Sequence, residues 1–519
     1  MRPDQNIWCH PERSEGSRPR NEFLRCVQDG SEKYRQGQLV TRQFVRRAFP
    51  FDAFFFWSWL AILLWSPIPL GSNRPWAWSL LQVAVCALSA WWLLCYSLQK
   101  VAVTEPFRRA KWFLWLLVLW LAYQAAFIVP MPREWISMLS PESLAMHALT
   151  DIFADPGTWK TLSIDPHTST VSWFKSLLYV LGFALTLLVI ANRSRARLFA
   201  YALVIFALLL SVYGLSMHLA EVSQVWFGTS IPHAMQASAT YPNRNHFAGF
   251  LEMTLAIGIG LLIAGLRDSR AQTWKQFLKH LLEWIFSAKM RLRLMLCVMV
   301  IALVATHSRM GNTAFFASMM IAGFIGIALS RHATRGTVIL LVSLIAIDLF
   351  IVGSWFGVEK LANRIEQTTI MQKGSEPTES IESRAEPAVY GLNLIKDYPI
   401  VGSGPGSWYV AFPRYRGGDL AHFFDYAHND FAQFTAESGA IGAALLAAIV
   451  VWSLVVALRA QYRRRDPLMR GLSFAAIMGV TAILIHSSVY FNLQIPANAM
   501  LFMVLLAFGW ISLYIDRRS

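Results

Sequence analysis

About twelve stretches of mostly apolar residues, each long enough to cross a lipid bilayer, constrain this chain more than any other feature. Hydrophobic residues make up 55% of the 519 residues, and charged residues only 15%. A soluble core of this size could not bury so much apolar surface. The sequence therefore predicts an all-α polytopic membrane protein of about 12 transmembrane helices, at residues 52–70, 76–98, 112–130, 173–191, 198–220, 246–266, 292–306, 312–329, 337–356, 438–458, 471–491 and 496–515.

The positions of the charges predict how the chain is oriented in the membrane. If residues 1–50 are cytoplasmic, the connections on that side hold 33 of the 46 Lys and Arg residues. The net charge is then about +21 on the cytoplasmic side and about −6 on the other, which is the asymmetry of the positive-inside rule. This asymmetry favours twelve spans with both termini cytoplasmic. It also explains the net charge of +15 without nucleic acid as a partner.

The chain divides into four segments. Residues 1–50 are polar and rich in Pro, Arg and Ser, so we expect a disordered cytoplasmic tail. Because they resemble translated intergenic repeat, we also expect a mis-called start codon. Residues 51–356 hold the first nine spans, residues 357–437 form a large outer loop, and residues 438–519 hold the last three spans and a short cytoplasmic tail. A loop of roughly 80 residues is much longer than a connection needs, which is typical of a functional loop.

One candidate group lies at the outer surface between the seventh and eighth spans, in the run Thr306-His307-Ser308-Arg309. The Arg309 guanidinium has two interpretations at this position. It is either a membrane anchor that reaches the lipid headgroups or a ligand for an anion. Position alone favours the anchor.

A second group lies in the segment Ile381–Trp408. Acidic residues around Ser383 favour a helix start there, with Arg384 in the first turns and a helix end at Asp397-Tyr398-Pro399. Three glycines follow, and no strand precedes them and no Lys-Ser/Thr pair follows them. Turn glycines therefore explain them better than a phosphate-binding loop. They are Gly402, Gly404 and Gly406.

A third group, in the segment Phe412–Gly442, mixes aromatic rings with ionisable and amide side chains. Such a surface can stack on sugar rings and hydrogen-bond their hydroxyls. His428 is the candidate general base. It can accept a proton from an alcohol while Asn429 and either Asp425 or Asp430 hold its tautomer. The other polar residues of the segment include Arg414, Arg416, His422 and Glu437.

A fourth group lies in the segment Tyr241–Glu252, at the outer mouth of the sixth span. We expect Asn243 or Asn245 to cap the helix that follows. The alternative is that Arg244 and His246 line a site. Three ionisable residues lie within spans, where such groups are costly, and an interhelical hydrogen bond is the favoured explanation for each. They are Glu252, Asp348 and His486.

In this order and on this side of the membrane, the four groups resemble the O-antigen ligase and polymerase family. The resemblance covers about Pro242 to Gly442 and rests on NRNHFAGFLE, the Ser308-Arg309 corner, the SR…Y…YP…GSGPGSW stretch and AHNDF…ESGAIG. The chain departs from the family pattern at two positions. Met310 follows the arginine where Gly is common, and Pro387 interrupts the expected helix after Arg384.

The resemblance implies a bacterial inner-membrane glycosyltransferase with a GT-C-like helical fold, short helices in a large periplasmic loop, and a periplasmic active site. It implies that Arg309 and Arg384 bind the pyrophosphate of an undecaprenyl-pyrophosphate-linked oligosaccharide and that His428 is the catalytic residue. The glycan would pass, with inversion, to an acceptor glycan on lipid A core, a lipid-linked repeat or a protein. No Asp-x-Asp pair occurs, so we expect no metal and no other cofactor. Further expected substrate-binding residues are Arg414, Arg416, Asn429, Asn245 and His246.

Two alternatives remain open. An O-antigen or exopolysaccharide polymerase performs the same chemistry and differs only in its acceptor. A transporter or flippase for lipid-linked oligosaccharide belongs to another class. The sequence weighs against this class, because the polar density lies outside the membrane and the spans show no internal duplication.

Overall fold

The computed structural model describes residues 49–150, 159–231, 236–265, 288–329, 381–417 and 424–515. Within these ranges, eight helices are long and apolar enough to cross a membrane. They are α3 (Pro75–Ser97), α8 (Pro166–Val189), α9 (Arg193–Leu219), α10 (Arg244–Ala264), α13 (Arg309–Ala328), α18 (Asp430–Arg463), α19 (Pro467–Ser487) and α20 (Pro496–Tyr514). This confirms an all-α polytopic membrane protein.

Three further helices coincide with predicted spans. They are α2 (Phe49–Trp65), α5 (Lys111–Ala125) and α12 (Ala288–Ala305). The first is shorter than the predicted 52–70, because Ser66-Pro67 leads into a turn and the 3-10 helix η1 (Leu70–Ser72). The predicted span at 337–356 with Asp348, the tail up to residue 48, and His422 lie outside the described residues.

The remaining elements are short, apart from the 17-residue α16, and most of them connect the long helices. The helices are α4 (Glu105–Arg109), α6 (Arg133–Leu139), α7 (Pro141–Thr150), α16 (Ile381–Asp397), α17 (Trp408–Ala411), η3 (Phe412–Arg414) and η4 (Asn492–Gln494). Two antiparallel strand pairs join β1 (Met131–Pro132) to β2 (Trp159–Lys160), and β3 (Gln224–Trp226) to β4 (Thr229–Ile231).

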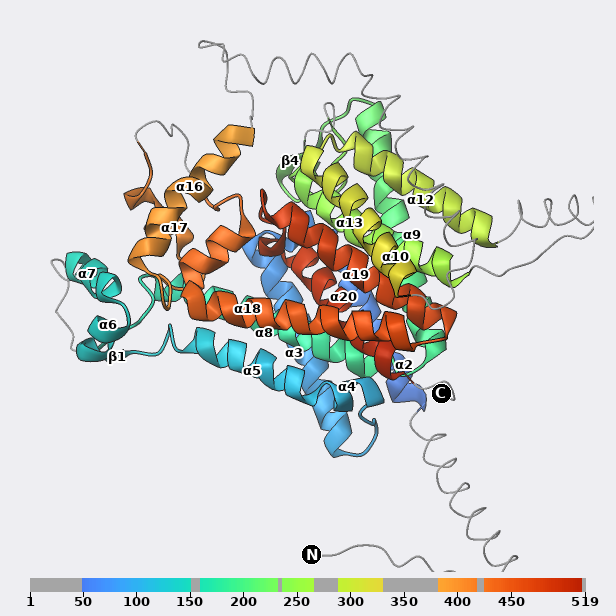
Figure 1. Cartoon of the computed structure of the whole chain (residues 1–519), viewed down its shortest axis with the longest axis horizontal. Helices are drawn as coiled ribbons and strands as arrows, with labels where there is room; N and C mark the ends of the chain where they lie inside the picture. The colour runs from blue at the N-terminus through green and yellow to red at the C-terminus, as the bar shows by residue number, and fades with distance from the viewer. Residues whose placement is uncertain are drawn as a thin grey trace, which may run out of the picture.

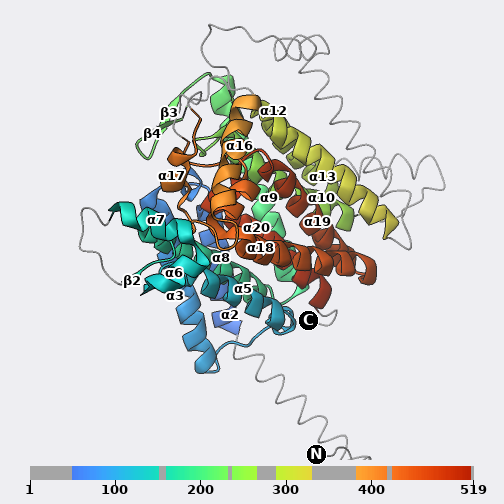
Figure 2. The same cartoon turned by 60° about the vertical axis from the view of Figure 1, so that its left-hand side comes forward.

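The centre of the bundle is formed by α10, α19 and α20, which are buried along most of their length. At one crossing, small residues let two backbones touch, since a Cβ on Gly260 would lie 2.2 Å from the carbonyl oxygen of Gly471. Helices α12 and α13 cover one side of this centre, and α5, α8 and α18 cover another (Figure 1). Helices α16 and α17 lie beside the amino end of α18 in both views (Figure 2).

Helix α18 bends at Gly439, whose φ of 60° and ψ of −172° are not helical. The bend separates an amino-terminal portion, Asp430–Ser438, from the part that matches the predicted span 438–458. Residues assigned to the outer loop by sequence are therefore helical and continuous with a span. The turn at His428 therefore directly precedes the amino end of the long helix α18.

Candidate active site

His428 sits in a tight turn just before α18. Its φ of 51° is in the left-handed region, which non-glycine residues rarely adopt. Asn429 is the N-cap of α18, and its side-chain oxygen accepts the backbone N–H of Ala432 at 3.0 Å. His428 thus directly precedes the cap residue of α18.

The His428 ring lies among aromatic rings. Its centroid is 4.9 Å from that of Phe491, at an interplanar angle of 89°, and 5.6 Å from that of Tyr490. Phe424 contacts it edge-on at 5.9 Å. Tyr426 stacks on Phe491, with the two ring centroids 4.4 Å apart. Edge-to-face contacts of this kind fix the plane of a ring, so the imidazole is held in one orientation.

The chain between α19 and α20 clamps the turn. The Asn429 side-chain amide donates to the carbonyl of Ser488 at 2.7 Å. The buried carboxylate of Asp430 accepts from the Ser487 hydroxyl at 2.7 Å and from the Leu493 backbone N–H at 3.0 Å. These hydrogen bonds fix the backbone beside His428. The expectation that Asn429 and either Asp425 or Asp430 hold the His428 tautomer stays a prediction.

Tyr426 is an ionisable residue two positions before His428. Burial, and then the carboxylates of Asp425, Glu437 and Asp430, raise its pKa to about 12. Its phenol is therefore neutral at ordinary pH. Asp425 is exposed.

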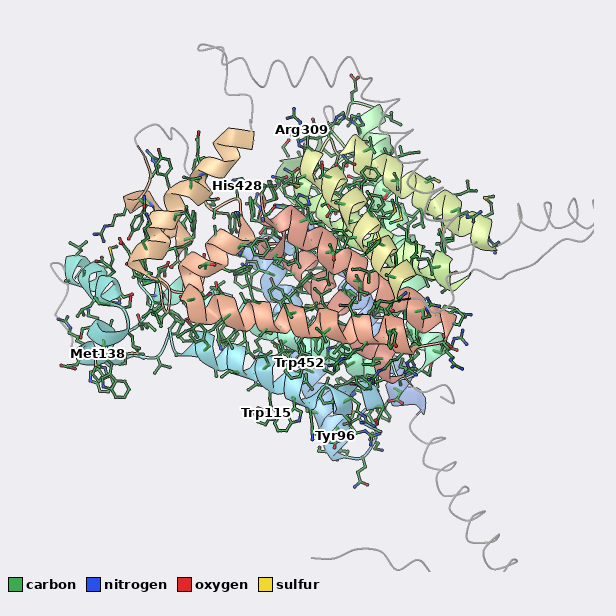
Figure 3. All side chains as sticks on the ribbon, viewed as in Figure 1. Tyr96, Trp115, Met138, Arg309, His428 and Trp452 are labelled. Carbon is green, nitrogen blue, oxygen red and sulfur yellow. The ribbon has the colours of Figure 1, made fainter. Side chains whose placement is uncertain are left out.

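Arg309 is the first residue of α13, and its side chain is exposed. Ser308 caps the helix, with its hydroxyl accepting the Gly311 backbone N–H at 3.2 Å. Arg309 and His428 lie toward the same edge of the molecule (Figure 3). The free N–H groups at the amino end of a helix favour an anion, and a guanidinium at its first position adds to that preference.

Arg384 lies in α16, and its side chain is outside the described residues. The helix runs unbroken through Pro387 and ends at Asp397, so Pro387 does not interrupt it as expected, and the predicted end is confirmed. Helix α16 packs on α18 through a small apolar cluster that includes Leu394, Trp408 and Ala436. A Cβ on Gly391 would lie 2.5 Å from the Trp408 ring, so only glycine permits this approach.

The glycine-rich loop after α16 is a turn, as predicted. Gly402, Gly404 and Gly406 have φ values of 84°, 118° and 78°. Glu437 holds the loop, because its carboxylate accepts the Gly406 backbone N–H at 2.9 Å and the Gln433 amide at 3.0 Å. The loop thus serves to dock α16 and α17 onto α18.

Arg414 and Arg416 are both exposed. Arg414 lies 3.4 Å from the carboxylate of Glu142 in α7. The neighbouring Tyr415 donates to Asp397 at 2.7 Å. The contacts of Arg414 therefore connect η3 to α7, and its placement at a substrate stays a prediction.

Asn245 and His246 are buried in the first turn of α10. Asn243, one of the two expected caps, is the N-cap, and its side-chain oxygen accepts the Asn245 backbone N–H at 2.9 Å. The His246 ring lies 5.0 Å from Phe491 and 5.3 Å from Tyr490. His246, on α10, thus contacts the same two rings as His428.

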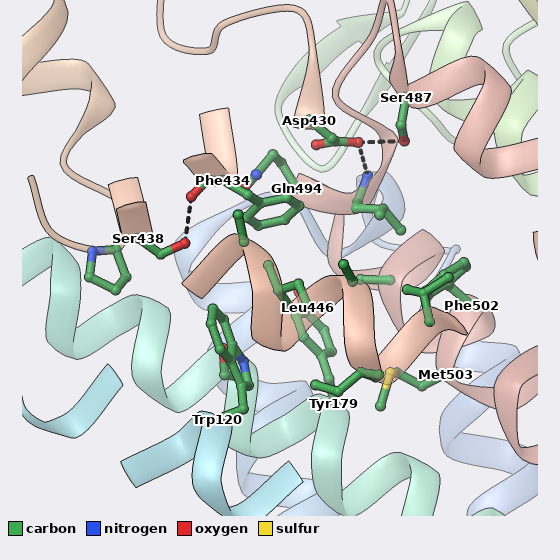
Figure 4. Close-up of a pocket in the computed structure, with 18 of the residues that line it drawn as sticks. Trp120, Tyr179, Asp430, Phe434, Ser438, Leu446, Ser487, Gln494, Phe502 and Met503 are labelled. Atoms are coloured by element: carbon green, nitrogen blue, oxygen red, sulfur yellow. Dashed lines mark hydrogen bonds between the residues drawn. The ribbon is translucent and has the colours of Figure 1, made fainter. Parts of the chain in front are cut away.

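A cavity of about 390 Å³ opens between α5, α8, α18 and α20 (Figure 4). Its walls are mostly apolar, with Trp120, Tyr179 and Phe502 among them, and Asp430 at one end. Asp430 is two residues from His428, so the cavity reaches the base of the candidate catalytic turn. This size falls in the range of ligand-binding pockets.

Comparison with known protein families found one similarity, over part of the chain. Residues 294–447 match the sequence model described as O-antigen ligase. This segment is therefore similar to the O-antigen ligase family. The match spans Arg309, Arg384 and His428, three of the residues predicted from sequence. No curated protein matches the chain.

The residues around His428 that sequence analysis missed come from outside the matched segment. Tyr490 and Phe491 were assigned to the end of a predicted span at 471–491, but α19 ends at Ser487. The pattern YFNLQIP offered a signal, since Asn492 and Pro496 interrupt an otherwise apolar run. The motif around His428 therefore does not reveal that the connection between α19 and α20 packs against this ring.

Proposed function

We propose that this chain is a membrane glycosyltransferase that moves a glycan from undecaprenyl pyrophosphate to a sugar hydroxyl. The observation that carries the proposal is the O-antigen ligase match over residues 294–447, which contains Arg309, Arg384 and His428. The oriented, half-buried imidazole of His428 supports it. The acceptor distinguishes a ligase from a polymerase, and both use the same step.

Arg309 and Arg384 are the proposed ligands of the donor pyrophosphate. A guanidinium is permanently charged and offers paired N–H donors that match phosphate oxygens. As the bond between sugar C1 and the phosphate oxygen breaks, negative charge grows on the pyrophosphate. A donor positioned for such charge is typically worth roughly 3 to 4 kcal/mol. The place of Arg309 at the amino end of α13 supports this role.

His428 is the proposed general base. Its neutral imidazole takes the proton of the acceptor hydroxyl as the oxygen attacks sugar C1, and the pyrophosphate leaves from the opposite face. This single displacement inverts the anomeric centre. A positioned base contributes on the order of 10² to 10⁴ in rate. The two arginines supply the positive charge at the leaving group, so we propose that the reaction needs no metal.

The cavity beside the turn has the character expected for part of an isoprenoid-linked substrate. Its mostly apolar walls suit a hydrocarbon chain, and Asp430, which also lines it, is two residues from His428. A lipid held there would bring its headgroup toward the turn. Asn245, His246, Asn429, Arg414 and Arg416 remain proposed contacts of the glycan.

We also propose the topology derived from the charges. Twelve spans with a GT-C-like arrangement would leave both termini in the cytoplasm of a bacterial inner membrane. Residues 357–437 would then form the periplasmic catalytic loop. The positive-inside asymmetry supports this orientation.

The test is transfer in detergent solution. Purified protein is incubated with an undecaprenyl-pyrophosphate-linked oligosaccharide and with either lipid A core or a second copy of the donor as acceptor. A longer or transferred glycan supports the enzyme and identifies the acceptor. Because transport has no meaning without a sealed membrane, a flippase would give no product.

A further inference from the structure

Two ionisable side chains to which no role has been assigned above are paired inside the bundle. Nδ1 of His486, on α19, lies 2.7 Å from Oε1 of Glu252, on α10, and both side chains are fully buried. The interhelical hydrogen bond expected for each from sequence is therefore confirmed, and the two residues are partners. A buried pair of this kind seldom adds much stability over apolar replacements, so its retention calls for another reason.

Glu252 contacts the amino end of α13. A Cβ on Gly311 would lie 3.1 Å from Glu252 Oε1 and 2.9 Å from the Ser308 hydroxyl. The carboxylate thus lies against the first turn of the helix that begins with Arg309, where the N–H groups favour a negative charge. Its position fixes where that turn rests on α10.

His486 contacts the other side of the candidate site. Its ring centroid lies 5.9 Å from that of Tyr490, and the Tyr490 ring lies 5.6 Å from His428. The next residue, Ser487, donates to Asp430 at 2.7 Å. His486 therefore lies next to the segment whose hydrogen bonds hold the His428 turn in place.

We infer that Glu252 and His486 form a positioning pair that sets the start of α13, with Arg309, in register with the turn that carries His428. The inference rests on the proposed function, since it assumes that Arg309 and His428 act in one step. Neither residue of the pair touches substrate. A hydrogen bond has a narrow range of length and angle, whereas apolar contacts between helices tolerate sliding.

If the pair positions the two elements, removing it should lower turnover without lowering the stability of the fold. In the double variant Glu252→Leu with His486→Leu, neither partner of the removed hydrogen bond is left buried and unpaired, so the thermal unfolding midpoint in detergent should stay equal or rise. A misplacement of about 1 Å between reacting groups can cost roughly 10²-fold, so kcat should fall by about that factor. KM for the donor should change far less, because both ligands of the pyrophosphate remain.

The double variant Glu252→Gln with His486→Asn tests the hydrogen bond itself. The Asn amide nitrogen replaces Nδ1 and the Gln oxygen replaces Oε1, so kcat should recover to within roughly tenfold of wild type if geometry is what matters. Ser473→Ala is the matched control on α19, since it removes a buried hydrogen bond to Gln461 (2.6 Å). It should leave kcat unchanged.

Wild-type kcat in the leucine double variant would overturn the inference. So would a loss of kcat that the Gln and Asn variants do not recover, or one that Ser473→Ala reproduces. His428→Ala is measured in parallel. If that variant keeps wild-type turnover, the proposed function fails, which is a different result from failure of the positioning pair.

Discussion

The carboxylate of Glu437 accepts the backbone N–H of Gly406 at 2.9 Å, which joins the amino-terminal portion of α18 to the loop that follows α16. The same carboxylate accepts from Gln433 one turn earlier. Helix α16 carries Arg384, and α18 follows His428. A single side chain therefore connects the elements on which two of the proposed functional residues stand.

Replacing Glu437 should loosen this connection. Glu437→Ala leaves the Gly406 N–H without its acceptor, which costs about 1–3 kcal/mol for a buried group. We expect a lower thermal unfolding midpoint in detergent and reduced transfer. Glu437→Gln keeps an acceptor oxygen and should lie between the alanine variant and wild type. An alanine variant as stable and as active as wild type would show that the loop is held by other contacts.

Arg309 should be required for turnover rather than for folding. Its side chain is exposed, so Arg309→Ala should insert and unfold like wild type while transfer falls by on the order of 10² to 10³. Arg309→Lys keeps the charge but loses the paired donors, and should recover only part of the rate. Transfer kinetics on purified variants measure this. Equal rates for Ala and wild type would make Arg309 a membrane anchor, the reading that position alone favoured.

The pH dependence of transfer should have a single acidic limb. A general base must be neutral to accept a proton, so the rate should rise with pH as the base loses its own proton. Tyr426, with its pKa raised to about 12, should add no alkaline limb below about pH 10. An alkaline fall in rate below about pH 10 that disappears in Tyr426→Phe would contradict this assignment.

Transfer should not depend on a divalent cation. The two arginines are proposed to neutralise the leaving pyrophosphate, so the rate in excess EDTA should equal that without chelator. A loss of transfer that added Mg²⁺ or Mn²⁺ restores would show that a metal shares this task.

The sequence predicted the elements that depend on local pattern. Apolar runs marked α8, α10 and α20 to within several residues, since a helix in lipid must satisfy its own backbone. Asn243 was predicted as one of two possible caps, and the glycines of the loop were predicted as turns. His428 was predicted as the general base from motif and chemistry, and that role stays a prediction.

The sequence could not show which distant segments contact one another. Glu252 and His486 are 234 positions apart, and each was visible only as a costly residue within a span. Tyr490 and Phe491, whose rings contact His428, lie at the end of an apolar run. Aromatic residues occur both in membrane helices and in the connections between them, so the sequence did not show that these two lie in a connection. The bend at Gly439 likewise depends on the close approach of Ile400, whose carbonyl oxygen would lie 2.3 Å from an added Cβ.

The most direct test of the account is the turnover of His428→Ala in the detergent transfer assay, with undecaprenyl-pyrophosphate-linked oligosaccharide and acceptor both saturating. The account predicts a fall in kcat of on the order of 10² to 10⁴, with a wild-type unfolding midpoint and little change in KM for the donor. Wild-type kcat in that variant would contradict a general base at this position.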